Sequence, residues 1–163
     1  MVGFGYDIHK LEQGEKLILG GIKILSNKKI TAHSDGDVLI HSIIDALLGA
    51  AGLGDIGEHF PDNDPKYKDI DSTKLLKIVK QWIENKKLYI VNIDATIVLE
   101  APKLSAYKND IKNNLAKILN IQPAIINIKA KTNEQQDSIG SNNSIAVYSI
   151  CQLTKTNKLE IKD

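Results

Sequence analysis

The chain of 163 residues contains no arginine, so all 21 of its basic residues are lysines. Any bound anion must therefore be held by lysine, backbone N–H groups or a metal, because no bidentate guanidinium is present. With a formal net charge of +1, the chain also lacks the positive excess of a surface that follows a nucleic-acid backbone. These two absences exclude a general nucleic-acid binder but leave room for a local anion pocket.

Cysteine and long apolar runs are also scarce. The single cysteine, Cys151, excludes an internal disulfide, fits a reducing compartment and is interpreted as a small core residue. No segment approaches the roughly 20 apolar residues of a spanning helix, and no secretory signal is recognised. With 42% hydrophobic and 25% charged residues and no visible linker or repeat, we expect a single globular domain over residues 1–163.

Apolar periodicity predicts strands and three helices. The expected strands cover residues 2–9, 17–25 (a strand or a hairpin bent at Gly20-Gly21), 88–100, 125–132 and 145–154, and the expected helices cover 37–51, 72–85 and 105–119. This order predicts an α+β fold, a mixed α/β sandwich. It would have one sheet of about four main strands with helices packed on one side, plus a short N-terminal hairpin.

Some details of these elements can be predicted as well. Ser34 or Asp35 is expected to cap the first helix, and Gly52 to end it. A loop is expected over residues 53–70. The strand signal is clearest at 88–100, where one face is expected to be buried. The residues of that face are Tyr89, Val91, Ile93, Ala95, Ile97 and Leu99.

Asp7, His9 and His41 are the most informative residues. All four histidines lie within the first sixty residues, which points to a site rather than to scattered surface imidazoles. Asp7 and His9 stand two apart on an expected strand and so project from one face. With His41 from the first helix, they suit a Zn²⁺ that keeps its fourth position open for a reactant.

A structural interpretation competes with the metal site. His9 and His41 could be hydrogen-bonded core histidines, with Asp7 an incidental surface acid. Asp45 lies one turn after His41 on the same helix face. It could orient the imidazole, as carboxylates often do for metal-bound histidines, or it could simply be a solvated acid.

Several motifs together resemble one family, the 2-C-methyl-D-erythritol 2,4-cyclodiphosphate synthases of the non-mevalonate isoprenoid pathway. The resemblance covers almost the whole chain, with the motifs in the family's order and spacing. They are Asp7-x-His9, the segment from Ala32 to His41, Leu53-Gly54-Asp55-Ile56-Gly57, Phe60-Pro61-Asp62-Asn63-Asp64-Pro65 and Ala101-Pro102-Lys103.

The resemblance implies a reaction. The substrate, 4-diphosphocytidyl-2-C-methyl-D-erythritol 2-phosphate, would be converted to 2-C-methyl-D-erythritol 2,4-cyclodiphosphate and CMP. The 2-phosphate attacks the β-phosphorus and expels CMP, which would make the enzyme a phosphorus–oxygen lyase. Such a phosphoryl transfer needs positioning and charge neutralisation more than a protein nucleophile. The resemblance also implies a homotrimer with active sites between subunits, in the bacterial cytoplasm, or in the plastid stroma if a transit peptide was removed.

The resemblance assigns roles to individual residues. Asp7, His9 and His41 would bind zinc, and Mg²⁺ or Mn²⁺ would bridge the substrate diphosphate near Glu134. The residues with catalytic roles would be Asp7, His9, His33, His41, Thr132 and Glu134. The substrate would contact Asp7, His9, His33, Ser34, Asp55, Ile56, Gly57, Phe60, Pro61, Asp62, Asn63, Asp64, Leu99, Glu100, Ala101, Pro102, Lys103, Leu104, Ser105, Lys131, Thr132, Asn133 and Glu134.

The chain departs from the family pattern in two places. Lys131 and Asn133 replace threonines that are common there. Residues 135–144 lack the Gly-Phe pair and the Gly-Arg-Gly-Glu stretch that are usual in the family. Because the arginine is missing, we hypothesise weak or absent binding of isoprenoid diphosphates in a central trimer cavity. Tight, specific binding of farnesyl or geranyl diphosphate in calorimetry would contradict this hypothesis.

Two other functions remain open from the residues alone. A zinc-dependent phosphoesterase could use the same three ligands with water as the nucleophile. A catalytically silent nucleotide-binding trimer could keep the zinc for structure alone. A purely structural zinc, however, normally has a fourth protein ligand.

Overall fold

The computed structural model describes residues 1–155 except 33, 62 and 68. Its main sheet has five strands in the order β4-β1-β7-β5-β6. Their bounds are β1 Val2–Gln13, β4 Lys28–Thr31, β5 Tyr89–Val98, β6 Ile126–Lys131 and β7 Ser144–Thr154. The β5–β6 pair is parallel and the other pairs are antiparallel. The α+β prediction is confirmed, with the short strand β4 as an addition that the sequence did not suggest.

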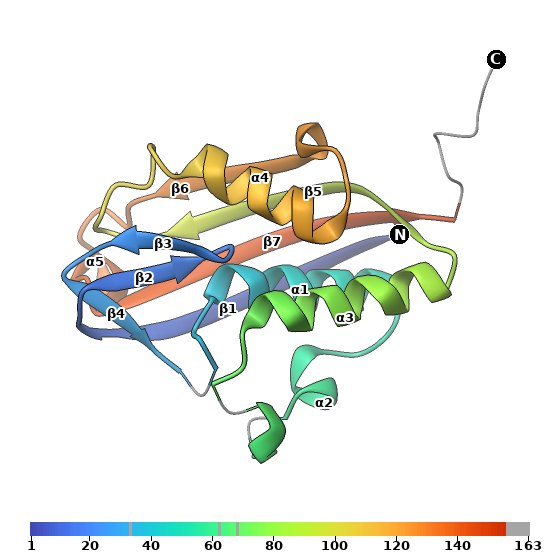
Figure 1. Ribbon diagram of the computed structural model, residues 1–163. Coiled ribbons are helices and arrows are strands. Elements are labelled where there is room, and N and C mark those ends of the chain that lie inside the picture. Colours follow the sequence, from blue (N-terminus) through green and yellow to red (C-terminus); the bar gives the residue numbers. More distant parts are fainter. Residues whose placement is uncertain (33, 62, 68, 156–163) are drawn as a thin grey trace.

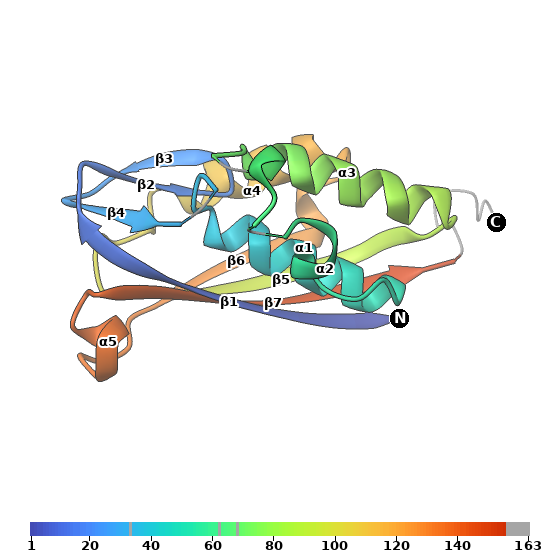
Figure 2. The same ribbon diagram turned by 90° about the horizontal axis from the view of Figure 1, so that it is seen from below.

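Three helices cover one face of this sheet, namely α1 (Val38–Ala51), α3 (Ser72–Asn85) and α4 (Lys108–Leu119) (Figures 1 and 2). Helix α1 lies against the sheet and under α3, so ten of its 14 residues are buried. The outer helices bury one stripe each, which on α3 comprises Leu75, Leu76, Val79 and Ile83. The predicted hairpin is the small sheet of β2 (Lys16–Leu19) and β3 (Ile22–Leu25). Within the described residues, no helix is long and apolar enough to cross a membrane.

The start of α1 differs from the expectation. Asp37, not Ser34 or Asp35, is the N-cap, and its carboxylate accepts from the backbone N–H of Ile40. The same buried carboxylate also accepts from Gly20 and Gly21 in the β2–β3 turn. Asp37 therefore joins the hairpin to the start of α1. The predicted end of the helix at Gly52 is confirmed, since Gly52 adopts a left-handed conformation.

Two further expectations need correction. Tyr89 is 41% exposed and does not belong to the buried face of β5, because an irregularity at Ile90/Asn92 changes the alternation. From Ile93 onward the predicted face is buried. The segments between the expected helices and strands contain α2 (Ile56–His59), α5 (Asp137–Gly140) and two 3-10 turns, Pro65–Tyr67 and Pro123–Ile125. Helix α5 projects on the side of the sheet away from the other helices (Figure 2).

Candidate metal centre and substrate pocket

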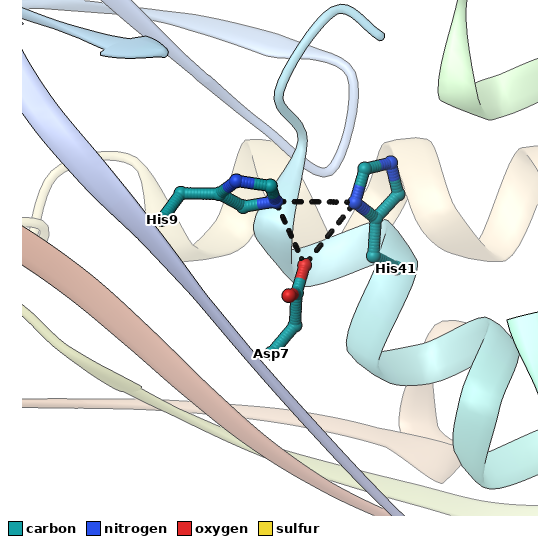
Figure 3. A group of neighbouring side chains, drawn as sticks. All are labelled: Asp7, His9 and His41. Atoms are coloured by element: carbon teal, nitrogen blue, oxygen red, sulfur yellow. Dashed lines mark hydrogen bonds and ion pairs between the residues drawn. The ribbon is translucent and has the colours of Figure 1, made fainter. Parts of the chain in front are cut away.

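Strand β1 and helix α1 bring the predicted metal ligands together. Residues Gly3, Gly5, Asp7 and His9 alternate toward the helix side of β1, whereas Val2, Phe4, Tyr6 and Ile8 are exposed on the other side. His41 lies in the first turn of α1 and points back toward β1 (Figure 3). The strand alternation that the sequence predicts thus places Asp7 and His9 on the side where His41 lies.

The three side chains converge on one point. Nε2 of His9 lies 3.0 Å from Oδ2 of Asp7 and 3.4 Å from Nδ1 of His41, and that Nδ1 lies 3.1 Å from Oδ2 of Asp7 (Figure 3). In a tetrahedral zinc site with bonds of about 2.0–2.1 Å, ligand atoms are separated by roughly 3.3 Å. The observed triangle is close to one face of such a tetrahedron. The donor set and its spacing therefore fit a divalent cation with a fourth position left open.

The electrostatics of the triad also favour a cation. Burial opposes ionisation of Asp7, but hydrogen bonds with His41 and His9 and their positive charge hold its pKa well below the usual range. Burial lowers the pKa of His41, but its hydrogen bond to Asp7 and the charges of Asp7, Asp37 and Asp35 raise it more. The ionised carboxylate of Asp7 thus favours a positive charge at Nδ1 of His41. Either a proton or a metal ion can supply that charge.

We expect metal affinity to rise with pH because the metal and a proton compete for His41. Because the pKa of His41 is raised, its imidazole keeps a proton to a higher pH than an isolated imidazole would, whereas the lowered pKa of Asp7 leaves that carboxylate ionised. For each pH unit below the pKa of His41, apparent affinity should fall by about tenfold. Calorimetric titration of the metal-free protein with Zn²⁺ at several pH values, in buffers of different ionisation enthalpy, would measure this effect. Affinity independent of pH would contradict proton competition.

The outward nitrogen of His41 contacts serines rather than Asp45. Nε2 of His41 lies 2.9 Å from Oγ of Ser72 and 3.2 Å from Oγ of Ser34. Asp45 instead accepts from the backbone N–H of Ile56 at the start of α2. The idea that Asp45 orients the imidazole is therefore wrong: Asp45 fixes the loop that follows α1. The sequence predicts Ser72 only as the first residue of a helix.

The triad lies in the wall of a cavity of about 470 Å³. Nine predicted site residues line it, namely Asp7, His9, Ser34, His41, Ile56, Gly57, Phe60, Pro61 and Asn63. His33 and Asp62 fall outside the described residues. Sequence reasoning missed Tyr6, Ala32, Tyr67, Ile70 and Leu75 as further lining residues. None of these five residues is charged, so nothing in the sequence separates them from core positions.

Two predicted substrate contacts in the loop after α1, Asp55 and Asp64, form hydrogen bonds that stabilise the backbone of that loop. Asp55 caps α2 by accepting from the N–H of Glu58, and Asp64 accepts from the N–H of Lys66 in the following turn. Neither lines the cavity. Phe60 is 7% exposed and stacks on Trp82 of α3, with ring centroids 5.6 Å apart. The aromatic contact holds the loop against α3, so the cavity has a fixed outer wall.

A second, smaller cavity of about 170 Å³ lies where β5 and β6 end. Its lining includes the predicted residues Leu99, Glu100, Pro102, Lys103, Leu104, Ser105, Lys131 and Thr132, together with the unpredicted Lys108. Ala101 does not line it. Glu100 accepts from the backbone N–H of Asn133, and Thr132 donates to Glu134 at 2.7 Å. Three lysines thus surround a cavity at an exposed sheet edge, which suits an anionic ligand.

Comparison with known proteins agrees with this geometry. A model of the YgbB family matches residues 1–154. The chain is 49% identical over 154 residues to the 2-C-methyl-D-erythritol 2,4-cyclodiphosphate synthase of Fusobacterium nucleatum, covering 94% of this chain and 96% of the relative. It is 53% identical over 152 residues to the synthase of the same name from Clostridium acetobutylicum, covering 93% of this chain and 98% of the relative.

A solved structure is also similar. The IspF structure from Plasmodium falciparum in complex with CDP has a TM-score of 0.84 and 36% identity, and the match covers 96% of both chains. The similarity therefore extends over the sheet, the helices and both cavities. The chain belongs to the YgbB family.

Proposed function

We propose that the chain converts 4-diphosphocytidyl-2-C-methyl-D-erythritol 2-phosphate to 2-C-methyl-D-erythritol 2,4-cyclodiphosphate and CMP. The observation that carries this proposal is the convergence of Asp7, His9 and His41 in the wall of a large cavity. Relatives about half identical to the chain bear the name of this synthase. In the reaction, an oxygen of the 2-phosphate bonds to the β-phosphorus, and the bond from that phosphorus to the CMP oxygen breaks. The enzyme is thus a phosphorus–oxygen lyase.

We propose Zn²⁺ for the triad, because two imidazoles and one carboxylate with an open fourth position are typical of catalytic zinc. When bound, it would polarise a phosphate oxygen as a Lewis acid. Ser34, close to this centre, would contact the methylerythritol phosphate part. The loop from Ile56 to Asn63 would enclose the sugar and limit access of water, which favours attack by the 2-phosphate over hydrolysis.

The smaller cavity is proposed as the cytidine site. Lys103, Lys108 and Lys131 can neutralise phosphate charge there, in a chain without arginine. Thr132 and Glu134 are exposed and hydrogen-bonded to each other. They would face the diphosphate, with Glu134 near a bridging Mg²⁺ or Mn²⁺. The chain is similar in structure to a Plasmodium falciparum relative in complex with CDP, which supports a substrate with a cytidine diphosphate part.

A homotrimer would bring the two cavities together. Within the described residues, the two sets of lining residues have no member in common, so the same chain does not form one continuous site. The outer face of β1 and β7 is uncovered and apolar, with Phe4 61% and Ile150 48% exposed. The ring centroids of Tyr6 and Tyr148 lie 5.0 Å apart on this face. Such an apolar sheet face is typical of a subunit interface.

Charge on that face should break the assembly. We expect the double variant Phe4→Glu/Tyr148→Glu to sediment as a monomer and to lose activity, because three copies would bury like charges together. Ile78→Glu, at a 38% exposed apolar position on α3, is the matched control and should leave the assembly intact. Sedimentation velocity measures both variants. A trimer that persists in the double variant would place the interface elsewhere.

Product analysis tests the proposed reaction directly. The protein loaded with Zn²⁺ and Mg²⁺ is incubated with the cytidylated substrate, and products are resolved by ³¹P NMR. Cyclic diphosphate with one equivalent of CMP supports the synthase. Linear hydrolysis products would instead indicate the phosphoesterase, and unchanged substrate would indicate the silent binding protein.

A further inference from the structure

Ser72 connects His41 to the half-buried carboxylate of Asp35. Its hydroxyl lies 2.5 Å from Oδ1 of Asp35 and 2.9 Å from Nε2 of His41. Ser72 is fully buried at the first position of α3, so water does not compete for these contacts. Asp35, Ser72 and His41 therefore form a continuous chain of hydrogen bonds that ends at the metal centre.

The proton of the Ser72 hydroxyl fixes the direction of this chain. A serine hydroxyl donates one hydrogen bond, and a carboxylate only accepts. At 2.5 Å, the contact with Asp35 lies in the range of charge-assisted O–H···O⁻ bonds. The Ser72 oxygen must then accept from His41, so Nε2 of His41 carries a hydrogen. Nδ1, the nitrogen nearest Asp7 and His9, is left as the nitrogen whose lone pair can bind a metal.

Backbone contacts hold Asp35 in the position that this chain requires. Its Oδ2 accepts from the backbone N–H of Ser72 at 3.0 Å, and its Oδ1 also accepts from the N–H of Asp37 at 3.2 Å. The N–H of Asp35 donates to the carbonyl of Ile70, a residue that lines the large cavity. The carboxylate is thus fixed by both α1 and α3, and it ties the end of the cavity loop to the metal centre.

We propose that Asp35 and Ser72 are positioning residues that hold His41 as its Nε2–H tautomer and so present Nδ1 to the metal. Histidines that bind metals usually donate their other N–H directly to a carboxylate or carbonyl. In this chain a buried serine stands between the imidazole and the carboxylate. The inference rests on the metal centre of the proposed function but not on the substrate or the reaction.

Metal affinity in the absence of substrate tests the proposal. Ser72→Ala removes the nearer of the two serine oxygens around Nε2–H and leaves only the longer contact with Ser34. It should weaken Zn²⁺ binding by about 10- to 100-fold, the range typical of such outer partners. Asp35→Asn keeps the shape of the side chain. Its amide can donate to Ser72, which would turn the Ser72 proton toward Nε2 and favour the wrong tautomer of His41. This variant should therefore weaken Zn²⁺ binding as well.

A matched control separates positioning from packing. Ser42 is also a fully buried serine, next to His41 on α1, but its hydroxyl donates to the carbonyl of Gly5 and lies 2.8 Å from Oγ of Ser149. Ser42→Ala should lower the melting temperature yet leave Zn²⁺ affinity within about twofold, since it leaves the imidazole contacts intact. Equal loss of Zn²⁺ affinity in Ser42→Ala and Ser72→Ala would overturn the proposal, as would unchanged affinity in Ser72→Ala.

Histidine NMR gives a readout independent of affinity and of catalysis. In the Zn²⁺-loaded protein with ¹⁵N-labelled histidine, His41 should show a hydrogen on Nε2, slow to exchange, and a metal-bound Nδ1. In Ser72→Ala this hydrogen should exchange faster with solvent. A His41 bound to Zn²⁺ through Nε2 would overturn the tautomer assignment. Failure of the cyclisation assay would instead affect only the proposed function, because neither measurement uses substrate.

Discussion

Asp7→Asn is expected to remove the bound metal and to lower kcat/KM for the proposed cyclisation by roughly 100- to 1,000-fold. The carboxylate is the only charged ligand of the triad, and its ionised form is what the two imidazoles stabilise. An amide oxygen is a weaker ligand without charge. Lewis-acid assistance is worth several kcal/mol, and each 1.36 kcal/mol of barrier changes the rate about tenfold.

Metal analysis and steady-state kinetics on the same preparation measure this prediction. Asp71→Asn is the matched control, because Asp71 is the N-cap of α3 and asparagine caps a helix about as well as aspartate. It should retain metal and activity. If Asp7→Asn lost its metal but kept its rate, the metal would have no part in the reaction. Full metal content in Asp7→Asn would instead show that Asp7 is not a ligand.

The triad could be predicted from sequence because it depends on local periodicity. Asp7 and His9 are two apart, and only an extended strand puts them on one face, where the glycines Gly3 and Gly5 also lie. Strand periodicity does not place His41 on this face; the clustering of the histidines suggests it, and the resemblance to the family implies it. Within the described residues, the structure gathers Asp7, His9 and His41 as the group of ligating side chains that could hold a metal.

Contacts between distant segments could not be predicted. Three residues, Ser34, Asp35 and Asp37, were near enough to the helix start to act as its cap. Asp37 is the cap because the distant turn at Gly20 and Gly21 directs its N–H groups at the same carboxylate. Ser72 reaches His41 across 31 positions, and nothing in its local sequence marks it as an imidazole partner. These choices depend on tertiary packing rather than on propensity.

Short polar strands and irregular alternation were the other sources of error. Strand β4 has the sequence Lys-Lys-Ile-Thr and lies at the sheet edge, so it has little apolar pattern from which to recognise it. Tyr89 continued an apparent alternation that the irregularity at Ile90/Asn92 interrupts. A strand pattern therefore predicts the buried face reliably only where pairing on both sides is regular, as it is from Ile93 to Val98.

Gly5→Ala is expected to lower stability by at least about 3 kcal/mol, near the upper end of the usual cost of overpacking a core. A Cβ on Gly5 would lie 2.0 Å from the carbonyl oxygen of Ser42, and one on Gly3 would lie 2.0 Å from that of Ala46. The clashing atoms belong to the backbone of α1 and cannot rotate away. Helix α1 would have to move away from β1.

That displacement should also damage the metal centre. Asp7 and His9 are on β1, and His41 is on α1, one residue before the clashing carbonyl of Ser42. Because the ligand atoms lie 3.0 to 3.4 Å apart, a shift of about 1 Å between strand and helix would spoil the triangle. We therefore expect Gly5→Ala to bind Zn²⁺ more weakly, in addition to losing stability.

Gly49→Ala is the matched control on the same interface. A Cβ on Gly49 would find its nearest neighbours at 3.9 and 4.0 Å, which is ordinary contact. In a helix interior, alanine is favoured over glycine by about 0.5–1 kcal/mol, so this variant should be slightly more stable. Thermal unfolding of both variants, with and without Zn²⁺, should show Gly5→Ala melting roughly 10 °C lower and Gly49→Ala slightly higher than the parent. If Gly5→Ala and Gly49→Ala melted at the same temperature, α1 and β1 would not approach each other as closely as described. The close contact of this strand and helix could then not be what sets the spacing of the metal ligands.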